Sequence, residues 1–227
     1  MSTSTPTPTS VAPAVDAVIN RELVLAFAAL LEYPVASLAA GARACEELAR
    51  GESEPAAALA GRFRSFAEAA PLEVLQEAYT SAFDLDTLSP SEPTCYPYIG
   101  HHLFEESHKR SAFLLGLRAL YGEHGFADDP SDLPDHLVTL LRFVVACDDD
   151  EAVAELVDEA LLPALVRMRA AIGDAPPAND CVSYQQLVGA LALALGVRRP
   201  AVDLDAVELE WNRPGDSLGI TRDTCGH

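Results

Sequence analysis

The stretch at residues 132–147, DLPDHLVTLLRFVVAC, begins with a polar cluster and continues as an apolar run. Leu137, Leu140 and Leu141 recur at the spacing of a single helical face. A helix with such a face stabilises a protein by packing that face against other apolar side chains. The stretch therefore predicts a core helix at residues 134–147, inside a larger helical assembly.

The polar cluster at the head of this stretch fits a helix start. Asp132 suits the N-cap position, and Asp135 three residues later completes a capping-box pattern. Pro134 is tolerated there because the first backbone N–H groups of a helix have no partner within the helix. These roles leave His136 unexplained, in the first turn and partly accessible. A helix start alone and a hydrogen-bonding handle for a ligand both remain open.

Helical periodicity continues on both sides of this stretch. Helices are predicted at residues 19–31, 38–51, 53–66, 71–83, 101–121, 134–147, 151–165 and 181–196. Ser53 can cap the third of these helices, Gly125 can stop the fifth, and Pro163 can kink the seventh. No alternating strand pattern exceeds four residues. The prediction is an all-α, single-domain bundle of about eight helices.

The remaining segments lack this periodicity. Residues 84–98, DLDTLSPSEPTCYPY, contain three prolines and predict a long loop, which in a compact domain is often functional. Residues 173–180 read as a linker, and residues 204–211 as one more short segment. We expect a disordered leader at residues 1–14, the all-α domain at residues 15–212 and a tail at residues 213–227.

Charge limits the classes of partner. The 227 residues include 35 acidic and 15 basic side chains, for a net charge of −20. This charge argues against nucleic acid or an anionic membrane as the partner. Residues 123–159 hold twelve acidic residues and one basic residue, Arg142. This acidic span forms either solvated helix faces or a surface that attracts a basic peptide.

Cysteine usage and the leader predict the compartment. The five cysteines never form a CxxC pair, so they indicate neither a disulfide framework nor a zinc knuckle. Scattered cysteines of this kind suit a reducing compartment. The leader lacks the charged and apolar regions of a secretory signal, and no run of 18 apolar residues exists. We expect a cytoplasmic protein.

Signs of an enzyme are weak. The sequence has no Walker A loop, GxGxxG, GxSxG or HExxH motif. His102 and Glu106 stand at i and i+4 and could form a ligand pair, although a surface pair is the simpler interpretation. A small all-α enzyme using Asp135 and His136 with His102 as acid and base stays an alternative. A generic helical scaffold or regulator is another alternative.

Two stretches carry a family resemblance. DLPDHLVTLLRFV, from Asp132, resembles the signature of the TorD/DmsD/NarJ family of molybdoenzyme assembly chaperones, closest to its NarJ-like branch. That signature places an acidic residue, two further residues and then Asp-His at the start of a helix. AYTSAFDLD, from Ala78, is similar to the aromatic–x–x–x–Phe–Asp segment of the family. The first acidic position, usually Glu in the family, is Asp132 here, which shortens its reach.

The resemblance implies a binding protein without catalytic or metal-binding residues. Such chaperones hold the N-terminal or twin-arginine region of a molybdoenzyme catalytic subunit while its molybdenum cofactor is inserted. Molybdopterin guanine dinucleotide then belongs to the client, and the chaperone itself binds no cofactor stably. Carboxylates suit guanidiniums, and an aromatic groove suits an apolar segment. The predicted client-binding residues are Tyr79, Phe83, Asp84, Tyr96, Tyr98, His102, Asp132, Asp135 and His136. The identity of the client and a dimer stay open.

Overall fold

The computed structural model describes residues 19–83, 96–104, 108–128, 132–172 and 181–196. The α-helices are α1 (Arg21–Leu30), α2 (Leu38–Glu52), α3 (Glu54–Ala69), α4 (Leu72–Phe83), α5 (Ile99–Leu103), α6 (His108–Glu123), α7 (Leu137–Ala146), α8 (Asp150–Leu156), α9 (Leu162–Ile172) and α10 (Cys181–Gly196). A π-helical turn, η1 (Val157–Leu161), links α8 to α9. These described ranges contain no strand, which confirms the predicted all-α, single-domain fold.

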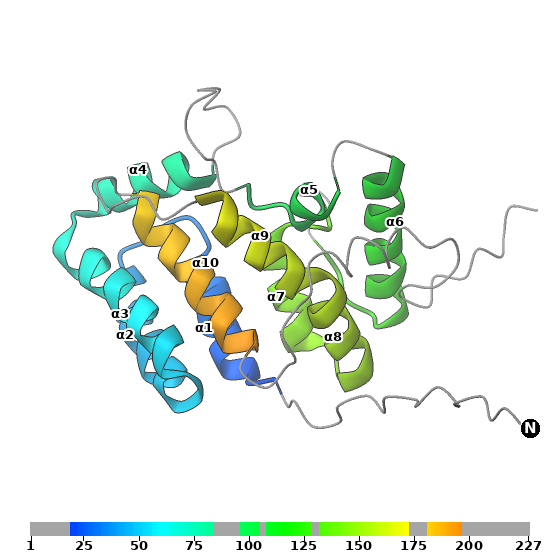
Figure 1. The fold of residues 1–227 in the computed structure, drawn as a ribbon, viewed down its shortest axis with the longest axis horizontal. Helices are drawn as coiled ribbons and strands as arrows, with labels where there is room; N and C mark the ends of the chain where they lie inside the picture. The colour runs from blue at the N-terminus through cyan, green and yellow to red at the C-terminus, as the bar shows by residue number, and fades with distance from the viewer. Residues whose placement is uncertain (1–18, 84–95, 105–107, 129–131, 173–180, 197–227) are drawn as a thin grey trace, which may run out of the picture.

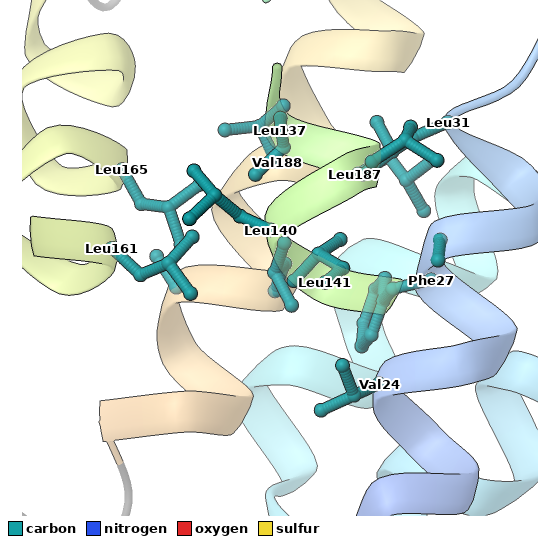
Figure 2. Close-up of a cluster of buried hydrophobic side chains, with 14 of the residues drawn as sticks. Val24, Phe27, Leu31, Leu137, Leu140, Leu141, Leu161, Leu165, Leu187 and Val188 are labelled. Atoms are coloured by element: carbon teal, nitrogen blue, oxygen red, sulfur yellow. The ribbon is translucent and has the colours of Figure 1, made fainter. Parts of the chain in front are cut away.

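The core lies where α1, α7, α9 and α10 meet (Figure 1). α10 also packs against α3 and α4, so it joins the two sides of the molecule. Figure 2 shows the buried side chains that point into this core: Val24, Phe27, Leu31, Leu137, Leu140, Leu141, Leu161, Leu165, Leu187 and Val188. Burial of each large apolar side chain contributes about 1.5–3 kcal/mol. The prediction that the leucine face of α7 is buried is confirmed.

Local signals set several helix ends as predicted. The Ser53 hydroxyl accepts a hydrogen bond from the Ala56 N–H at 3.3 Å and caps α3. Gly125, which follows α6, has a φ of 64°, a left-handed conformation that glycine adopts without steric cost. Asp149 accepts hydrogen bonds from the Glu151 and Ala152 N–H groups and caps α8.

The single helix predicted at residues 101–121 is wrong, because the structure divides this region into α5 and α6. Phe104, the C-cap of α5, has an extended backbone with φ −129° and ψ 126°. Its ring packs against Phe113 with 5.4 Å between ring centroids. Arg167 of α9 donates to the carbonyls of His102 and Leu103, which satisfies the end of α5. Tertiary partners therefore end α5 after five residues.

A kink was predicted at Pro163 and stays a prediction, while the structure has a π-helical turn, η1, that ends two residues before this proline. Proline has no N–H to donate to the carbonyl four residues earlier, and its ring crowds that carbonyl. A wider turn relieves this crowding and lets the chain continue as a helix. Val157, Ala160 and Leu161 of the turn remain buried, so the packing is preserved.

The last turn of α7 is closed by a side chain from another helix. The guanidinium of Arg21, at the start of α1, donates to the carbonyls of Val145 and Cys147. Its other nitrogen pairs with Asp150 at 2.7 Å. Carbonyls at a helix end have no partner within the helix, so this arginine satisfies groups that α7 cannot satisfy itself.

Several predictions concern parts of the chain outside the described residues. These are the leader at 1–14, most of the 84–98 loop, the linker at 173–180, the segment at 204–211 and the tail at 213–227. Within the described ranges, no helix combines the length and apolar character needed to span a lipid bilayer.

Candidate functional site

Two segments distant in sequence meet at the start of α7. The N–H of Leu137 donates to the carbonyl of Pro97 at 2.7 Å. This bond belongs to an isolated antiparallel bridge between Tyr98 and His136. The rings of these two residues lie edge to face, with 5.5 Å between ring centroids. The structure therefore brings together two of the predicted client-binding residues.

His136 itself is the N-cap of α7. Its Nδ1 accepts a hydrogen bond from the Val138 N–H at 3.3 Å, and its backbone is extended. The helix begins at Leu137, three residues later than predicted. The predicted capping box of Asp132 and Asp135 is therefore wrong, and His136 precedes the first turn rather than lying in it.

The physical reason is competition for backbone groups just before α7. The carbonyl of Pro134 accepts a hydrogen bond from the Tyr121 hydroxyl at 2.7 Å. The carbonyl of Asp135 accepts one from the Ile99 N–H at 2.9 Å. These hydrogen bonds direct the two carbonyls toward Tyr121 and Ile99, whereas in a helix they would point at the N–H four residues later, so these residues stay outside the helix.

Asp135 points into the protein. Its side chain is 0% exposed, and its Oδ2 accepts from the Gly100 N–H at 3.0 Å. Oδ2 lies 3.6 Å from Nη2 of Arg110. Burial raises the pKa of this carboxyl, while the charge of Arg110 opposes the rise. Asp135 therefore holds α5 and α6 against the start of α7, and its carboxylate does not face solvent.

The accessible edge of the site is formed by Asp132, Tyr98 and His136. The Tyr98 hydroxyl donates to Oδ1 of Asp132 at 3.3 Å, and this oxygen also accepts from the Leu133 N–H. Oδ2 of Asp132 lies 3.8 Å from Nδ1 of His136. The side chains of Asp132 and His136 are 33% and 17% exposed, which confirms the predicted partial accessibility of His136. We call these three residues the α7 edge.

Acidification below about pH 6.5, the ordinary pKa of histidine, is expected to destabilise the protein. Burial is the largest cause that lowers the pKa of His136, and burial lowers that of His102 to about 4. Between these lowered values and 6.5 the unfolded chain binds protons that the folded chain excludes. Each histidine then removes up to about 1.4 kcal/mol of stability per pH unit.

Urea unfolding over a pH series checks this expectation, with His136→Asn as the matched variant. Asparagine keeps an N-cap acceptor but does not titrate, so its stability should fall less between pH 6.5 and the lowered pKa of His136. Asp135 acts in the opposite sense at the acidic end, because its raised pKa lets the folded chain bind a proton first. Equal pH slopes for both proteins would show that His136 is not responsible.

The four aromatic residues predicted to line one groove are divided among separate contacts. Tyr79 and Phe83 pack against each other and against the buried Tyr184. Phe83 is itself buried, at 7% exposed. The ring of Tyr98 contacts that of His136, and the ring of Tyr96 contacts that of His101, with 4.1 Å between centroids. Tyr98 also acts electrostatically on the Tyr79 hydroxyl, so Tyr79, Phe83 and Tyr98 belong to one neighbourhood, and the groove itself stays a prediction.

His102 is tied to the segment before α5. Its Nε2 lies 2.8 Å from the carbonyl of Tyr96, and burial keeps its ring neutral. The partners of Asp135 are Gly100 and Arg110, while His136 caps α7. None of these contacts joins His102 to Asp135 or His136, the three residues that the enzyme alternative named as acid and base. Two further residues of the predictions, Asp84 and Glu106, lie outside the described part of the chain.

Sequence reasoning missed the neighbours of Tyr79. Its hydroxyl donates to the carbonyl of Leu31 at 3.3 Å, and its ring meets Tyr33 edge-on at 5.6 Å. Burial raises the pKa of Tyr79, and the charges of Glu32 and Asp132 raise it further. The loop after α1 thus lies near the α7 edge. The break at Pro34 marked a helix end, but gave no sign of this neighbourhood.

Comparison with known proteins places the chain. A family model described as nitrate reductase delta subunit matches residues 47–172, which is more than half of the sequence. The chain belongs to this family. Members of the nitrate reductase delta family are redox-enzyme maturation chaperones, and they act with a molybdoenzyme catalytic subunit. The predicted membership in the TorD/DmsD/NarJ group is confirmed. No curated protein gave a significant match to the chain.

Proposed function

We propose that this member of the nitrate reductase delta family is a dedicated cytoplasmic chaperone rather than an enzyme. It holds the N-terminal region of a molybdoenzyme catalytic subunit, including a twin-arginine segment where one is present. Release follows the insertion of molybdopterin guanine dinucleotide, a cofactor that belongs to the client. The observation that carries the proposal is the family match, which spans the α7 edge.

The α7 edge has the chemistry that such a peptide needs. Asp132 offers a partly exposed carboxylate, and carboxylates accept paired hydrogen bonds from a guanidinium. Tyr98 and His136 present ring surfaces beside it, which suit the apolar side chains next to an arginine. Asp135 has a different role, because its buried carboxylate positions Tyr98 and His136 through α5.

The acidic span at residues 123–159 supports a basic partner. The span contains twelve acidic side chains and a single basic side chain, Arg142 on α7. Exposed charges attract an opposite charge over a Debye length of about 10 Å at 0.1 M salt. Such attraction speeds the encounter of chaperone and client, whereas apolar contacts slow their separation.

Co-purification with a molybdoenzyme catalytic subunit from the same organism tests the proposal. The synthetic N-terminal peptide of that subunit then serves for surface-based kinetics over a salt series. We expect the association rate to fall as salt rises, while the dissociation rate changes much less. Absence of binding to both the intact subunit and the peptide would remove the chaperone function.

Asp132→Asn is expected to lower the affinity for that peptide about tenfold or more, because a hydrogen bond to a charged group contributes about 1.5–3 kcal/mol. Stability should change little, since the side chain is partly in water. Asp148→Asn, an exposed acidic position beyond the other end of α7, is the matched control and should bind as the unaltered protein does. Equal weakening by both changes would indicate a diffuse charge effect instead of a site.

A further inference from the structure

The loop between α1 and α2, residues 31–37, holds two large apolar side chains in water. Tyr33 is 54% exposed and Val35 is 59% exposed. The exposed large apolar side chains of the described ranges are Leu25, Tyr33, Val35, Leu115 and Leu133. Single exposed leucines are ordinary on protein surfaces, whereas Tyr33 and Val35 lie two residues apart in one loop, and we call these two side chains the patch.

Contacts with α4 hold this loop in place. The Tyr79 hydroxyl donates to the carbonyl of Leu31, and Nε2 of Gln76 donates to the carbonyl of Pro34 at 3.1 Å. The ring of Tyr33 packs edge-on against that of Tyr79. A loop fixed in this way loses little conformational entropy when a partner covers it. Figure 1 shows the loop, in blue, running beside α4.

Two carboxylates flank the patch. Glu32 lies in the same loop, and its side chain is 46% exposed. Arg142 of α7 pairs with Glu32 and so joins this loop to α7, and Asp132, just before α7, acts with Glu32 on the Tyr79 hydroxyl. Apolar and acidic groups are therefore combined over a short distance. A partner that fits must bring apolar side chains and a cation together.

We propose that Glu32, Tyr33, Val35 and Asp132, here called the Tyr33–Val35 surface, bind a peptide segment in which arginine adjoins apolar side chains. The apolar side chains cover Tyr33 and Val35, and the guanidinium binds Glu32 or Asp132. The inference rests on the proposed function, because it assigns the apolar half of the client contact to the loop after α1.

The chain already shows the polar half of this contact. The guanidinium of Arg142, on α7, forms an ion pair with Glu32. The two side chains are 53% and 46% exposed, and exposed pairs contribute little stability, so an incoming guanidinium can replace Arg142. An acidic peptide is disfavoured on the same surface by the net charge of −20.

The test uses the full chain and a synthetic amphipathic peptide with leucines along one face and two arginines at its edge. Tyr33→Ser combined with Val35→Ser is expected to weaken binding about tenfold, since two large apolar contacts are lost. Leu25→Ser and Leu115→Ser, at positions 51% and 67% exposed, are the controls and should change affinity by less than about twofold. Calorimetric titration measures all four proteins.

Charge is tested separately on the same surface. Glu32→Gln should make the association rate less sensitive to salt than it is for the unaltered protein. With a peptide that has glutamines in place of its arginines, the two proteins should show the same salt sensitivity. If the double variant proves less stable, Val35→Ser alone, which keeps the contact between Tyr33 and Tyr79, should still weaken binding. Equal binding by the Tyr33 and Val35 variants and by both controls overturns the proposal, as does no binding of the peptide to the unaltered protein.

Co-purification of the catalytic subunit tests the proposed function separately from the Tyr33–Val35 surface. If the molybdoenzyme catalytic subunit co-purifies with the unaltered protein and with the double variant alike, and the peptide also binds both, the inference fails and the chaperone function stands. If the peptide requires Tyr33 and Val35 but no molybdoenzyme subunit co-purifies, the surface is supported and the chaperone function fails.

Discussion

Replacing Gly100 with alanine is expected to lower the free energy of unfolding by about 3 kcal/mol, from overpacking and a disturbed buried hydrogen bond. A Cβ there would lie 2.7 Å from Oδ2 of Asp135 and 3.2 Å from the ring of Phe113. That oxygen cannot retreat freely, because it accepts the Gly100 N–H. Urea unfolding followed by circular dichroism measures the loss.

The control for this change is Gly122→Ala on α6. Apart from the chain neighbours and backbone of its own helix, no atom lies within 4 Å of a Cβ at Gly122, so the substitution should be neutral or stabilising by up to about 1 kcal/mol. The contrast removes the general effect of exchanging glycine in a helix. Similar stabilities for the two variants would contradict the close approach of α5 to Asp135.

Replacing Asp135 with alanine is expected to cost about 3 kcal/mol, the lower end of the range for breaking a buried pair. The change leaves the Gly100 N–H without its acceptor and the Arg110 guanidinium without its counter-charge. The lower end applies because the Arg110 side chain is 26% exposed and can reach water. Asp132→Ala, at a partly exposed position, should cost less than about 1 kcal/mol.

A double-mutant cycle separates the pair from the hydrogen bond. Arg110→Met together with Asp135→Ala should be less destabilised than the two single losses predict, because no unpaired charge remains. Asp135→Asn keeps an acceptor for the Gly100 N–H and should fall between the unaltered protein and Asp135→Ala. If Asp132→Ala and Asp135→Ala prove equally destabilising, the buried role of Asp135 is wrong.

The local sequence pattern was sufficient to predict helix boundaries that are set by residues of the helix itself. The predicted range 181–196 coincides with α10, whose apolar run ends at Gly196. The serine at position 53 and the glycine at position 125 act as the local signals indicate. In these places side chain and backbone satisfy each other within a few residues, so distant contacts are not needed to find the boundary.

The start of α7 could not be predicted in this way. Asp132 and Asp135 have the spacing of a capping box, but Tyr121 and Ile99 take the carbonyls that a longer helix would use. Those competitors lie 13 and 36 residues away from their acceptors, and nothing in the local pattern reveals them. The histidine left unexplained by the sequence is the residue that the structure makes the cap.

The same limit applies to the candidate site. The sequence pattern drew attention to Tyr98 and His136, and the structure joins them across the bridge. It gave no means of separating Asp135, which is buried, from Asp132, which is accessible. Tyr33 and Val35 escaped notice because exposure depends on how neighbouring elements cover a loop. Burial is a property of the assembled molecule.

Arg21 determines how far the amino end of the chain can be trimmed before the fold suffers. Its guanidinium donates hydrogen bonds to the last carbonyls of α7 and pairs with Asp150 at the start of α8. A chain cut after this arginine retains every leucine of the core but loses the link between the first helix and the α7–α8 junction. Such a cut also removes Asn20, which caps α1 and donates to Glu52, so polar side chains ahead of the apolar pattern help to determine the amino boundary of the stable unit.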